Sequence, residues 1–271
     1  MGTGPPYDHF VVSHVTAPTA EVLTSLPDWV TLVRAPNPGP MTLDGTNTWL
    51  LRAPGGGCVV VDPGPLDEGH LRAVAGHAPI AAIILTHSHE DHTEGVPRLA
   101  ELTGAPVHQP PVHATLDVDG VLIEPVITPG HTADSVCFAA RHDDQRLMLT
   151  GDTILGRGTT IVAWPDGDLG DYLNSLRLLA GFEGVPALPG HGPALTDTAV
   201  AARFYHQHRQ ARLEQVRAAL AAGATDPAEV VALVYADVDR SLWEAAKWSV
   251  RAQLAYLSRE SQPPQPGLDA T

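Results

Sequence analysis

The sequence is poor in cysteine and has no long apolar run, and each shortage excludes a class of protein. Its two cysteines, Cys58 and Cys137, lie far apart and form no C-x-x-C pair, which is typical of core thiols in a reducing cytoplasm rather than of a disulfide scaffold. No apolar run approaches the ~18 residues that a membrane-spanning helix needs, and no basic start followed by an apolar run indicates a signal peptide. We therefore expect a cytoplasmic protein without a membrane partner.

Basic residues are scarce as well. The chain has 271 residues with 16 Lys and Arg against 31 Asp and Glu, a formal net charge of −15, and Lys247 is its only lysine. Because phosphate groups are bound by clustered Lys and Arg, this balance argues against a broad nucleic-acid surface, while a local basic groove stays compatible with it. Hydrophobic residues make up 44% of the chain, so length and composition predict one large domain, alone or with a small second one.

What the sequence does contain is an alternation of two kinds of segment: short apolar runs, and stretches in which apolar residues recur at helical intervals. Runs of the kind that form strands lie at 29–34, 46–51, 58–61, 80–85, 106–108, 121–127, 135–139, 146–150 and 185–188. Helical spacing lies at 67–76, 94–102, 168–180, 196–222 and 241–259, with a short helix that Thr225 is expected to cap. Strands alternating with helices predict an α/β fold in which helices cover a sheet.

Composition divides the chain into four parts. Residues 1–27 contain several prolines and little periodicity, which predict an irregular lead-in with one short strand at 10–12. Residues 28–195 carry the alternating elements and form the expected catalytic domain, and residues 196–260 form the expected C-terminal helical region. The tail at 261–271 is rich in proline and polar residues, so we expect it to be disordered.

The stretch T-H-S-H-E-D-H at 86–92 concentrates metal ligands directly after a predicted buried strand. A turn at a strand end lets a rigid scaffold hold side chains at a site. On such a turn we expect His87 and His89 to point one way, and Asp91 and His92 another. This arrangement predicts two adjacent metal ions rather than one.

Further ligand candidates follow other predicted strands, each in a Pro-Gly-His or Gly-Asp turn: His131, Asp152 and His191. Strand ends along one edge of a sheet converge, so these distant residues can meet the first stretch. One metal can then take His87, His89 and His131, and the other Asp91, His92 and His191. Asp152 has two oxygens and can bridge both ions, while Asp62, at another strand end, can orient a ligand. Neutral imidazoles with carboxylates suit Zn²⁺, and also Fe or Mn.

Four motifs together resemble those of the metallo-β-lactamase-fold hydrolase superfamily. They are H-S-H-E-D-H at 87–92, P-G-H-T at 129–132, G-D-T at 151–153 and P-G-H-G at 189–192, and the resemblance covers about residues 28–195. It implies an αββα sandwich and a dinuclear site with the ligands given above. Asp152 stands where the commonest zinc β-lactamases carry Cys, and His89 where flavodiiron proteins carry Glu, so both residues argue against those two branches.

Two more stretches are similar to the lactamase-β-like protein 2 subfamily, which is related to glyoxalase II. They are residues 37–50, which include N-P-G-P and G-T-N-T-W-L, and the helical ending at about 225–257. In that subfamily the ending forms a small winged-helix-like domain beside the active site, and some members cleave single-stranded RNA. A plain helical cap that binds no ligand is equally compatible with this ending.

The expected function is that of a dinuclear zinc hydrolase, in which a bridging hydroxide attacks the substrate and Asp91 and Asp152 are the catalytic carboxylates. A small thioester, ester or lactone is the favoured substrate because the chain is acidic. A single-stranded RNA endoribonuclease is the second hypothesis, and it requires a groove lined by Arg157, Arg177, Arg203, Arg209, Arg212 and Lys247. A non-catalytic metal- or partner-binding protein and a dioxygenase-type iron enzyme also stay open. Nothing indicates an oligomeric state.

Three residues outside the ligand set have open interpretations. Arg157, just after Asp152, can reach an anionic substrate or be a solvated loop arginine. His206 and His208 lie two positions apart on one predicted helix and so not on the same face, and we expect both at the surface.

Overall fold

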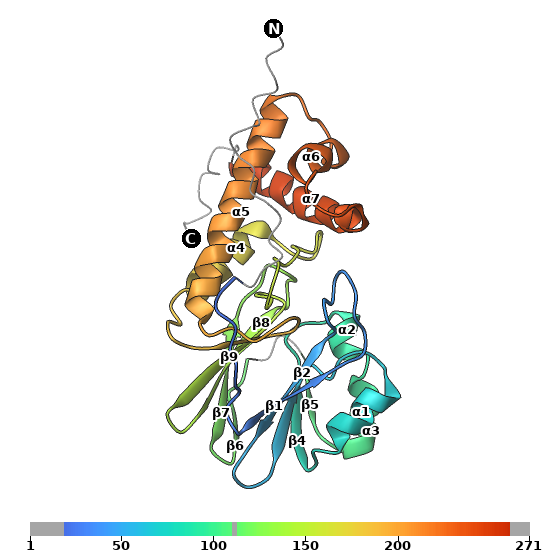
Figure 1. The fold of residues 1–271 in the computed structure, drawn as a ribbon, viewed down its shortest axis with the longest axis vertical. Helices are drawn as coiled ribbons and strands as arrows, with labels where there is room; N and C mark the ends of the chain where they lie inside the picture. The colour runs from blue at the N-terminus through green and yellow to red at the C-terminus, as the bar shows by residue number, and fades with distance from the viewer. Residues whose placement is uncertain (1–18, 110–112, 261–271) are drawn as a thin grey trace, which may run out of the picture.

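Two five-stranded sheets pack face to face in the computed structural model, which describes residues 19–109 and 113–260 (Figure 1). The expected strand at 10–12 and the expected disordered tail lie outside these residues. The first sheet contains, in spatial order, β1 (Val30–Arg34), β2 (Asn47–Arg52), β3 (Cys58–Val61), β4 (Ile80–Ile84) and β5 (Val107–His108). The second contains β10 (Ala187–Pro189), β9 (Gln145–Gly151), β8 (Val136–His142), β7 (Val121–Ile127) and β6 (Leu116–Val118).

Connections between strands decide which strands are parallel. In the first sheet β1, β2 and β3 are antiparallel neighbours joined by short turns, whereas β3, β4 and β5 are parallel. Parallel neighbours need a crossover, and the crossovers carry α1 (Glu68–Ala75), α2 (Glu90–Thr93) and α3 (Val96–Thr103). In the second sheet only β9 and β10 are parallel, and α4 (Leu169–Leu179) lies between them in the chain.

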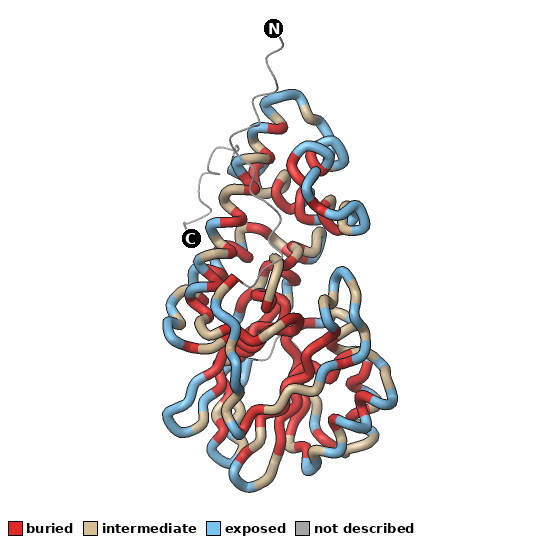
Figure 2. The backbone as a smooth tube through the Cα atoms, viewed as in Figure 1, coloured by how far each residue is buried: buried red, intermediate tan, exposed pale blue. Residues whose placement is uncertain are grey.

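In the first sheet β3 and β4 are apolar at every position, because residues pack against both of its faces there. Along β3, Val59 and Val61 face the core between the sheets, whereas Cys58 and Val60 face α1 and α3. Cys137 of β8 faces the helices on the other side of the sandwich, and Cys58 and Cys137 are buried free thiols as expected. Figure 2 shows the buried residues along the strands. The result is the predicted αββα sandwich, which is confirmed.

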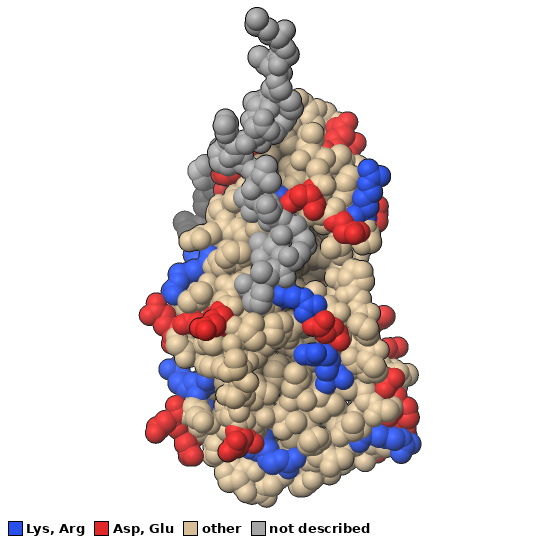
Figure 3. Space-filling model, viewed as in Figure 1, with Lys and Arg blue, Asp and Glu red and all other residues tan. Residues whose placement is uncertain are grey.

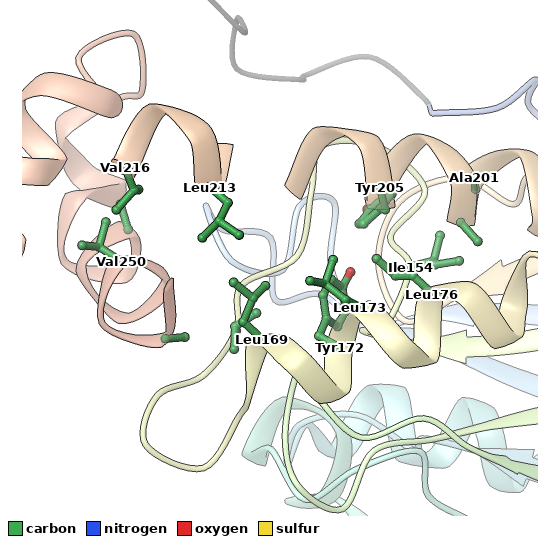
Figure 4. Packing of buried hydrophobic residues seen from close by; sticks show 14 of the residues in the cluster. Ile154, Leu169, Tyr172, Leu173, Leu176, Ala201, Tyr205, Leu213, Val216 and Val250 are labelled. Atoms are coloured by element: carbon green, nitrogen blue, oxygen red, sulfur yellow. The ribbon is translucent and has the colours of Figure 1, made fainter. Parts of the chain in front are cut away.

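The outer helical layer on the second sheet extends into the C-terminal region. α5 (Thr198–Ala221) packs along α4, and beyond it lie α6 (Pro227–Val234), the 3₁₀ turn η1 (Arg240–Leu242) and α7 (Trp243–Glu260). Figure 4 shows Leu176 of α4 facing Ala201 and Tyr205 of α5, and Val216 of α5 beside Val250 of α7. One helix therefore packs on the sandwich with its first half and on the C-terminal helices with its second. Among the described residues, none of the helices is both long and apolar enough to cross a membrane.

Three details of the sequence prediction are wrong. The helix expected at 94–102 begins later, as α3 at Val96, and a separate short helix, α2, precedes it; at Gly95, between the two, a Cβ would lie 2.7 Å from a methyl group of Leu71. Asp226, not Thr225, caps α6, since its carboxylate accepts the backbone N–H groups of residues 228 and 229. The strand β6 was not predicted, because its three residues are too few to distinguish a strand period from chance. The division at 195/196 stays a prediction.

The close packing of the β7–β8 turn on α4 generates a test of stability. Gly130 has φ +138°, and a Cβ there would lie 2.3 Å from the Cα atom of Tyr172. We expect Gly130→Ala to lower the free energy of unfolding by about 2–5 kcal/mol, from backbone strain together with overpacking. Urea denaturation measures the change.

Gly184→Ala is the matched control for this variant. Gly184 also has a positive φ, +67°, but a Cβ there would meet nothing within 4 Å. We expect a loss of only about 1–2 kcal/mol from its left-handed backbone. Equal losses in the two variants would show that the contact with α4 contributes nothing.

Candidate metal centre

All seven candidate ligands lie together at the edge where strands of both sheets end. His87 and Asp152 follow β4 and β9, His191 follows β10, and His131 lies in the turn between β7 and β8. The ligands form three overlapping groups whose donor atoms lie within 4.8 Å of one another. The groups consist of His87, His89 and His131; of Asp91, His92 and His191; and of His87, His92 and Asp152.

The first group is a triangle of imidazoles. His87 Nε2 lies 3.0 Å from His89 Nδ1, and His131 Nε2 lies 3.1 Å from the same atom. Imidazole nitrogens can offer lone pairs to a common point, and nitrogen lone pairs at such distances repel unless a proton or a cation lies between them. This donor set suits a divalent cation.

The second group combines two imidazoles with a carboxylate. His92 Nε2 and His191 Nε2 lie 3.3 Å apart, and Asp91 Oδ2 lies 3.1 Å from His191 Nε2 and 3.6 Å from His92 Nε2. Both rings are completely buried, whereas Asp91 is partly exposed. Two nitrogens and an oxygen again face one point.

Asp152 lies between the two groups with one oxygen toward each. Its Oδ1 is 3.5 Å from both His92 Nε2 and His191 Nε2, while its Oδ2 is 3.8 Å from His131 Nε2. Oδ1 is buried and makes no well-formed hydrogen bond. A buried carboxylate oxygen in this position is costly unless a cation satisfies it. The donor set therefore fits two metal ions that share Asp152.

Hydrogen bonds behind the rings hold each Nε2 toward the centre. His131 Nδ1 lies 2.6 Å from the carbonyl oxygen of Ile161, and His191 Nδ1 lies 3.3 Å from that of Gly45. Because a carbonyl only accepts, each Nδ1 is assigned as the protonated nitrogen, which leaves the lone pair on Nε2. Such outer partners orient metal-binding histidines.

Asp62 provides the corresponding partner for His92. Its Oδ2 lies 2.9 Å from His92 Nδ1, and its two oxygens accept hydrogen bonds from the backbone N–H and the hydroxyl of Thr86 at 2.8 and 2.7 Å. Asp62 has φ +53°, and this bend turns its side chain toward the end of β4. The structure thus puts Asp62 behind a candidate ligand. Thr86, which the sequence reasoning did not single out, links Asp62 to the turn.

The protonation of the two groups differs in the absence of metal. Burial lowers the pKa of His87 well below its usual range and lowers the pKa of His131 to about 4, so both rings are neutral at pH 7. Burial also lowers the pKa of His92 and His191, but the surrounding carboxylates, Asp152 foremost, together outweigh it, so the pKa of His92 rises well above its usual range and that of His191 rises to about 9. Protons therefore neutralise the second group until a cation displaces them.

The turn at 86–92 differs from expectation in one respect. Residues 90–93 form the short helix α2 instead of an open turn. The rings of His87 and His92 have centroids 4.2 Å apart, so His87 borders both groups instead of pointing away from the second. The helical turn that begins at Glu90 brings the ring of His92 back beside that of His87.

A cavity adjoins the centre between the sandwich and the C-terminal helices. It holds about 870 Å³, including open solvent at its mouth, and His131 and Asp152 lie in its wall. Its apolar lining comes from Met41, Leu43, Leu155, Ile161, Tyr235, Val238, Leu242, Ala245 and Ala246. The helical ending thus forms part of the wall of the space beside the centre.

Three arginines also line this cavity: Arg157, Arg209 and Arg212. Arg157, expected to reach substrate or solvent, forms a two-pronged ion pair with Asp44. The other cations named for an RNA groove are not in the lining; Arg203 pairs with Glu183 and Lys247 with Glu244. On the face drawn in Figure 3, Lys and Arg are scattered among Asp and Glu.

His208 shows that the expectation of a surface position was wrong. Only 8% of it is exposed, and it lines the cavity beside Arg209 and Arg212, which are 4% and 2% exposed. Tyr205, Arg209 and Val216 are buried and lie about one or two helical turns apart, so they form one buried stripe along α5. Helical periodicity could have found this stripe, but arginine in a helix suggests a solvated face.

Comparisons with known proteins agree on the fold. Residues 41–117 and 105–191 match the metallo-beta-lactamase superfamily, and residues 227–262 match the beta-lactamase associated winged helix domain. The second match confirms the predicted winged-helix-like ending. A lactamase-like protein, aptB, from Emericella nidulans is 34% identical over 76% of this chain and 70% of that protein. A beta-lactamase-like protein 2 homolog from Caenorhabditis elegans is 30% identical over 85% of this chain and 82% of that protein.

Solved structures extend the likeness to nearly the whole chain. A metallo-beta-lactamase family protein from Thermus thermophilus has a TM-score of 0.71 at 22% identity and covers 90% of this chain and 97% of that chain. A beta-lactamase domain protein from Burkholderia ambifaria has a TM-score of 0.74 at 21% identity, with 91% and 93% covered. TTHA1623, solved in a di-iron-bound form, has a TM-score of 0.50 at 26% identity, with 64% and 98% covered.

Metal content tests the centre directly. We expect the wild-type protein to retain two metal ions per chain after dialysis and the double variant His87→Ala, Asp152→Ala to retain at most one, because one group and the shared carboxylate are lost. Elemental analysis measures the ratio. His113→Ala, at an exposed histidine outside the three groups, is the control and should retain both ions. Full metal content in the double variant would contradict the assignment.

Stability of the metal-free protein should depend on pH. The folded-state pKa of His191, about 9, lies above the usual 6.5, so its contribution is complete below pH 6.5 and is lost as the pH rises through 9. We expect the free energy of unfolding to fall by on the order of 1–3 kcal/mol across this window. Chemical denaturation of chelator-treated protein measures it. Asp152→Asn should remove most of the slope, since it removes the carboxylate that raises the pKa; an unchanged slope would contradict this cause.

Proposed function

The chain belongs to the metallo-beta-lactamase superfamily, and on that premise we propose that it is a cytoplasmic hydrolase that binds two zinc ions. The observation that carries the proposal is Asp152, whose two oxygens face separate groups of imidazoles at 3.5 and 3.8 Å. Iron or manganese would suit the same nitrogen and oxygen donors. The di-iron form of TTHA1623 supports the proposal of two ions, and it makes iron an alternative to zinc.

Each set of residues would have a separate task. His87, His89 and His131 would hold one ion, Asp91, His92 and His191 the other, and Asp152 both. Bound metal ions supply a nucleophile at neutral pH by acidifying water, and they polarise the electrophilic oxygen of the substrate. Asp91, the partly exposed carboxylate of the set, can accept a proton from attacking water and return it to the leaving group.

A small ester, thioester or lactone is the substrate class that we propose. Its apolar body would lie in the cavity, whose walls from Met41, Leu155 and Val238 are apolar. Its carbonyl would reach the centre where His131 and Asp152 form the cavity wall. Pockets of this kind, mostly apolar with a few polar groups, are typical of small-molecule sites.

Single-stranded RNA is the second candidate, favoured by the three arginines in the cavity wall. Against it, Arg157 and Arg212 are paired with Asp44 and Asp237. Arg177, Arg203 and Lys247, the remaining cations of the expected groove, lie outside the lining, and the last two pair with acidic side chains. A strand of phosphates needs a row of unpaired cations, so the small substrate is favoured.

Turnover by protein of known metal content tests the proposal. We expect zinc-loaded protein to hydrolyse at least one member of a panel of esters, thioesters and lactones, with kcat/KM reduced at least about 1000-fold in the variant His87→Ala, Asp152→Ala. Hydrolysis of the small substrate should be nearly insensitive to salt, whereas RNA cleavage would weaken steeply as salt rises. Fully metal-loaded protein that turned over none of the panel and no RNA would point to a non-catalytic binding protein.

A further inference from the structure

Arg209 is a buried cation in the wall of the cavity beside the metal centre. It lies on α5, is 4% exposed, and lines the same cavity as His131 and Asp152. Its Nη2 donates a hydrogen bond to the carbonyl oxygen of Thr160, and its guanidinium lies 5.4 Å from the centroid of the Tyr172 ring. Its Nε–H is buried and has no hydrogen-bond partner. The side chain is thus held in place with donor capacity left over.

The other two arginines of the cavity are already neutralised. Arg157 pairs with Asp44, and Arg212 pairs with Asp237 and donates to the carbonyl oxygen of Val234. Within the part of the chain that the structure describes, no carboxylate forms an ion pair with Arg209. Of the three cations, it is therefore the one with charge to offer a ligand.

An unpaired guanidinium in a buried position carries a large desolvation cost. Burying an ion costs several kcal/mol unless a counter-ion compensates it, and a carbonyl and an aromatic ring compensate only in part. Arginine stays protonated in proteins, so it cannot escape the cost by losing its proton. An anion that entered the cavity and paired with Arg209 would offset this desolvation cost.

The contacts of Arg209 put this cation close to the metal centre. Thr160, whose carbonyl oxygen it contacts, has its hydroxyl 3.3 Å from His131 Nδ1. His131 is a member of the first imidazole group and also lies in the cavity wall. One residue therefore separates the guanidinium from a candidate metal ligand, and a small molecule can contact both.

We propose that Arg209 binds an anionic group of the substrate, and that the substrate is an acyl compound with an apolar body and a carboxylate away from the scissile carbonyl. This inference rests on the proposed hydrolase function and narrows its substrate class. The carboxylate matches the forked donors of a guanidinium, and the apolar body matches the walls formed by Leu155, Val238 and Leu242. The scissile carbonyl then reaches the metal centre.

Two other roles for Arg209 give different outcomes. It could hold the loop at Thr160 and thereby His131, in which case its loss would slow all substrates alike. It could bind a phosphate of RNA, in which case oligoribonucleotides and not carboxylate esters would depend on it.

Paired substrates that differ only at the far end of the acyl chain separate these roles. One series has p-nitrophenyl monoesters of six-, eight- and ten-carbon dicarboxylic acids, and the other the p-nitrophenyl esters of monocarboxylic acids of equal length. We expect the zinc-loaded wild-type protein to prefer the carboxylate-ended ester, by kcat/KM, at least about 10-fold at the best length. Arg209→Gln should abolish the preference, mainly through KM, and leave the methyl-ended ester within about 3-fold of wild type.

Arg203→Gln is the matched control, at an exposed arginine earlier on the same helix that pairs with Glu183, and it should keep the wild-type preference. Arg209→Lys keeps the positive charge but loses the forked donors of the guanidinium. It should keep part of the preference for the carboxylate-ended ester, so the test remains decisive if Arg209→Gln folds poorly. An equal loss for both series in either Arg209 variant, or no preference in the wild type, would overturn the proposal. RNA cleavage that depends on Arg209, with no turnover of either ester series, would also overturn it.

Binding without turnover separates this inference from the hydrolase proposal. Calorimetry should show octanoate binding to wild-type protein at least about 10-fold more tightly than to Arg209→Gln, both zinc-loaded and after chelation. The chelated arm excludes direct binding of the carboxylate to metal. Octanoate binding that depends on Arg209, together with no hydrolysis of any ester, would support the anion site and contradict the hydrolase. Hydrolysis with no such binding would do the reverse.

Discussion

The burial of the Asp152 carboxylate between two sets of imidazoles is the constraint on which the rest of the site depends. Its oxygens face nitrogens of His92, His191 and His131, and one of them has no well-formed hydrogen bond. A buried charge of this kind is stable only if positive charge accompanies it. Without metal the two imidazoles of the second group carry that charge as protons, and cations in the centre would replace them. The outward hydrogen bonds of the histidines serve the same arrangement, since they fix the nitrogen that faces inward.

Backbone geometry at the strand ends makes this concentration of polar groups possible. Gly151 ends β9 with φ +47°, and a Cβ there would lie 2.5 Å from the hydroxyl of Thr86, so the backbone of β9 lies directly against the Thr86 side chain beside the centre. Asp62 adopts a positive φ although it carries a side chain, at a cost of order 1–3 kcal/mol. Its carboxylate offsets that cost with hydrogen bonds to Thr86 and His92.

Sequence reasoning could locate the candidate ligands because their pattern is local. Each follows an apolar strand, and strand ends of a sheet share an edge, so residues as distant as His87 and His191 could be predicted to meet. The order of the strands within each sheet could not be predicted, because it depends on contacts between distant segments. Nor could the role of His87 at the border of both groups, because it follows from the one-turn helix α2, which is too short to produce periodicity.

Dependence on contacts between distant segments also explains why the residues of the cavity wall could not be predicted from the sequence. Arg209 and His208 belong to a helix that looks solvated from its composition, yet both are buried, and Arg209 contacts the Tyr172 ring of α4 and the carbonyl oxygen of Thr160. That placement changes what the net charge of −15 implies. Charge spread over a wet surface is screened within ~10 Å by salt, whereas a guanidinium in a cavity of low dielectric acts strongly at short range. An acidic protein can therefore select an anionic ligand at one interior point, and its surface charge argues only against extended polyanions.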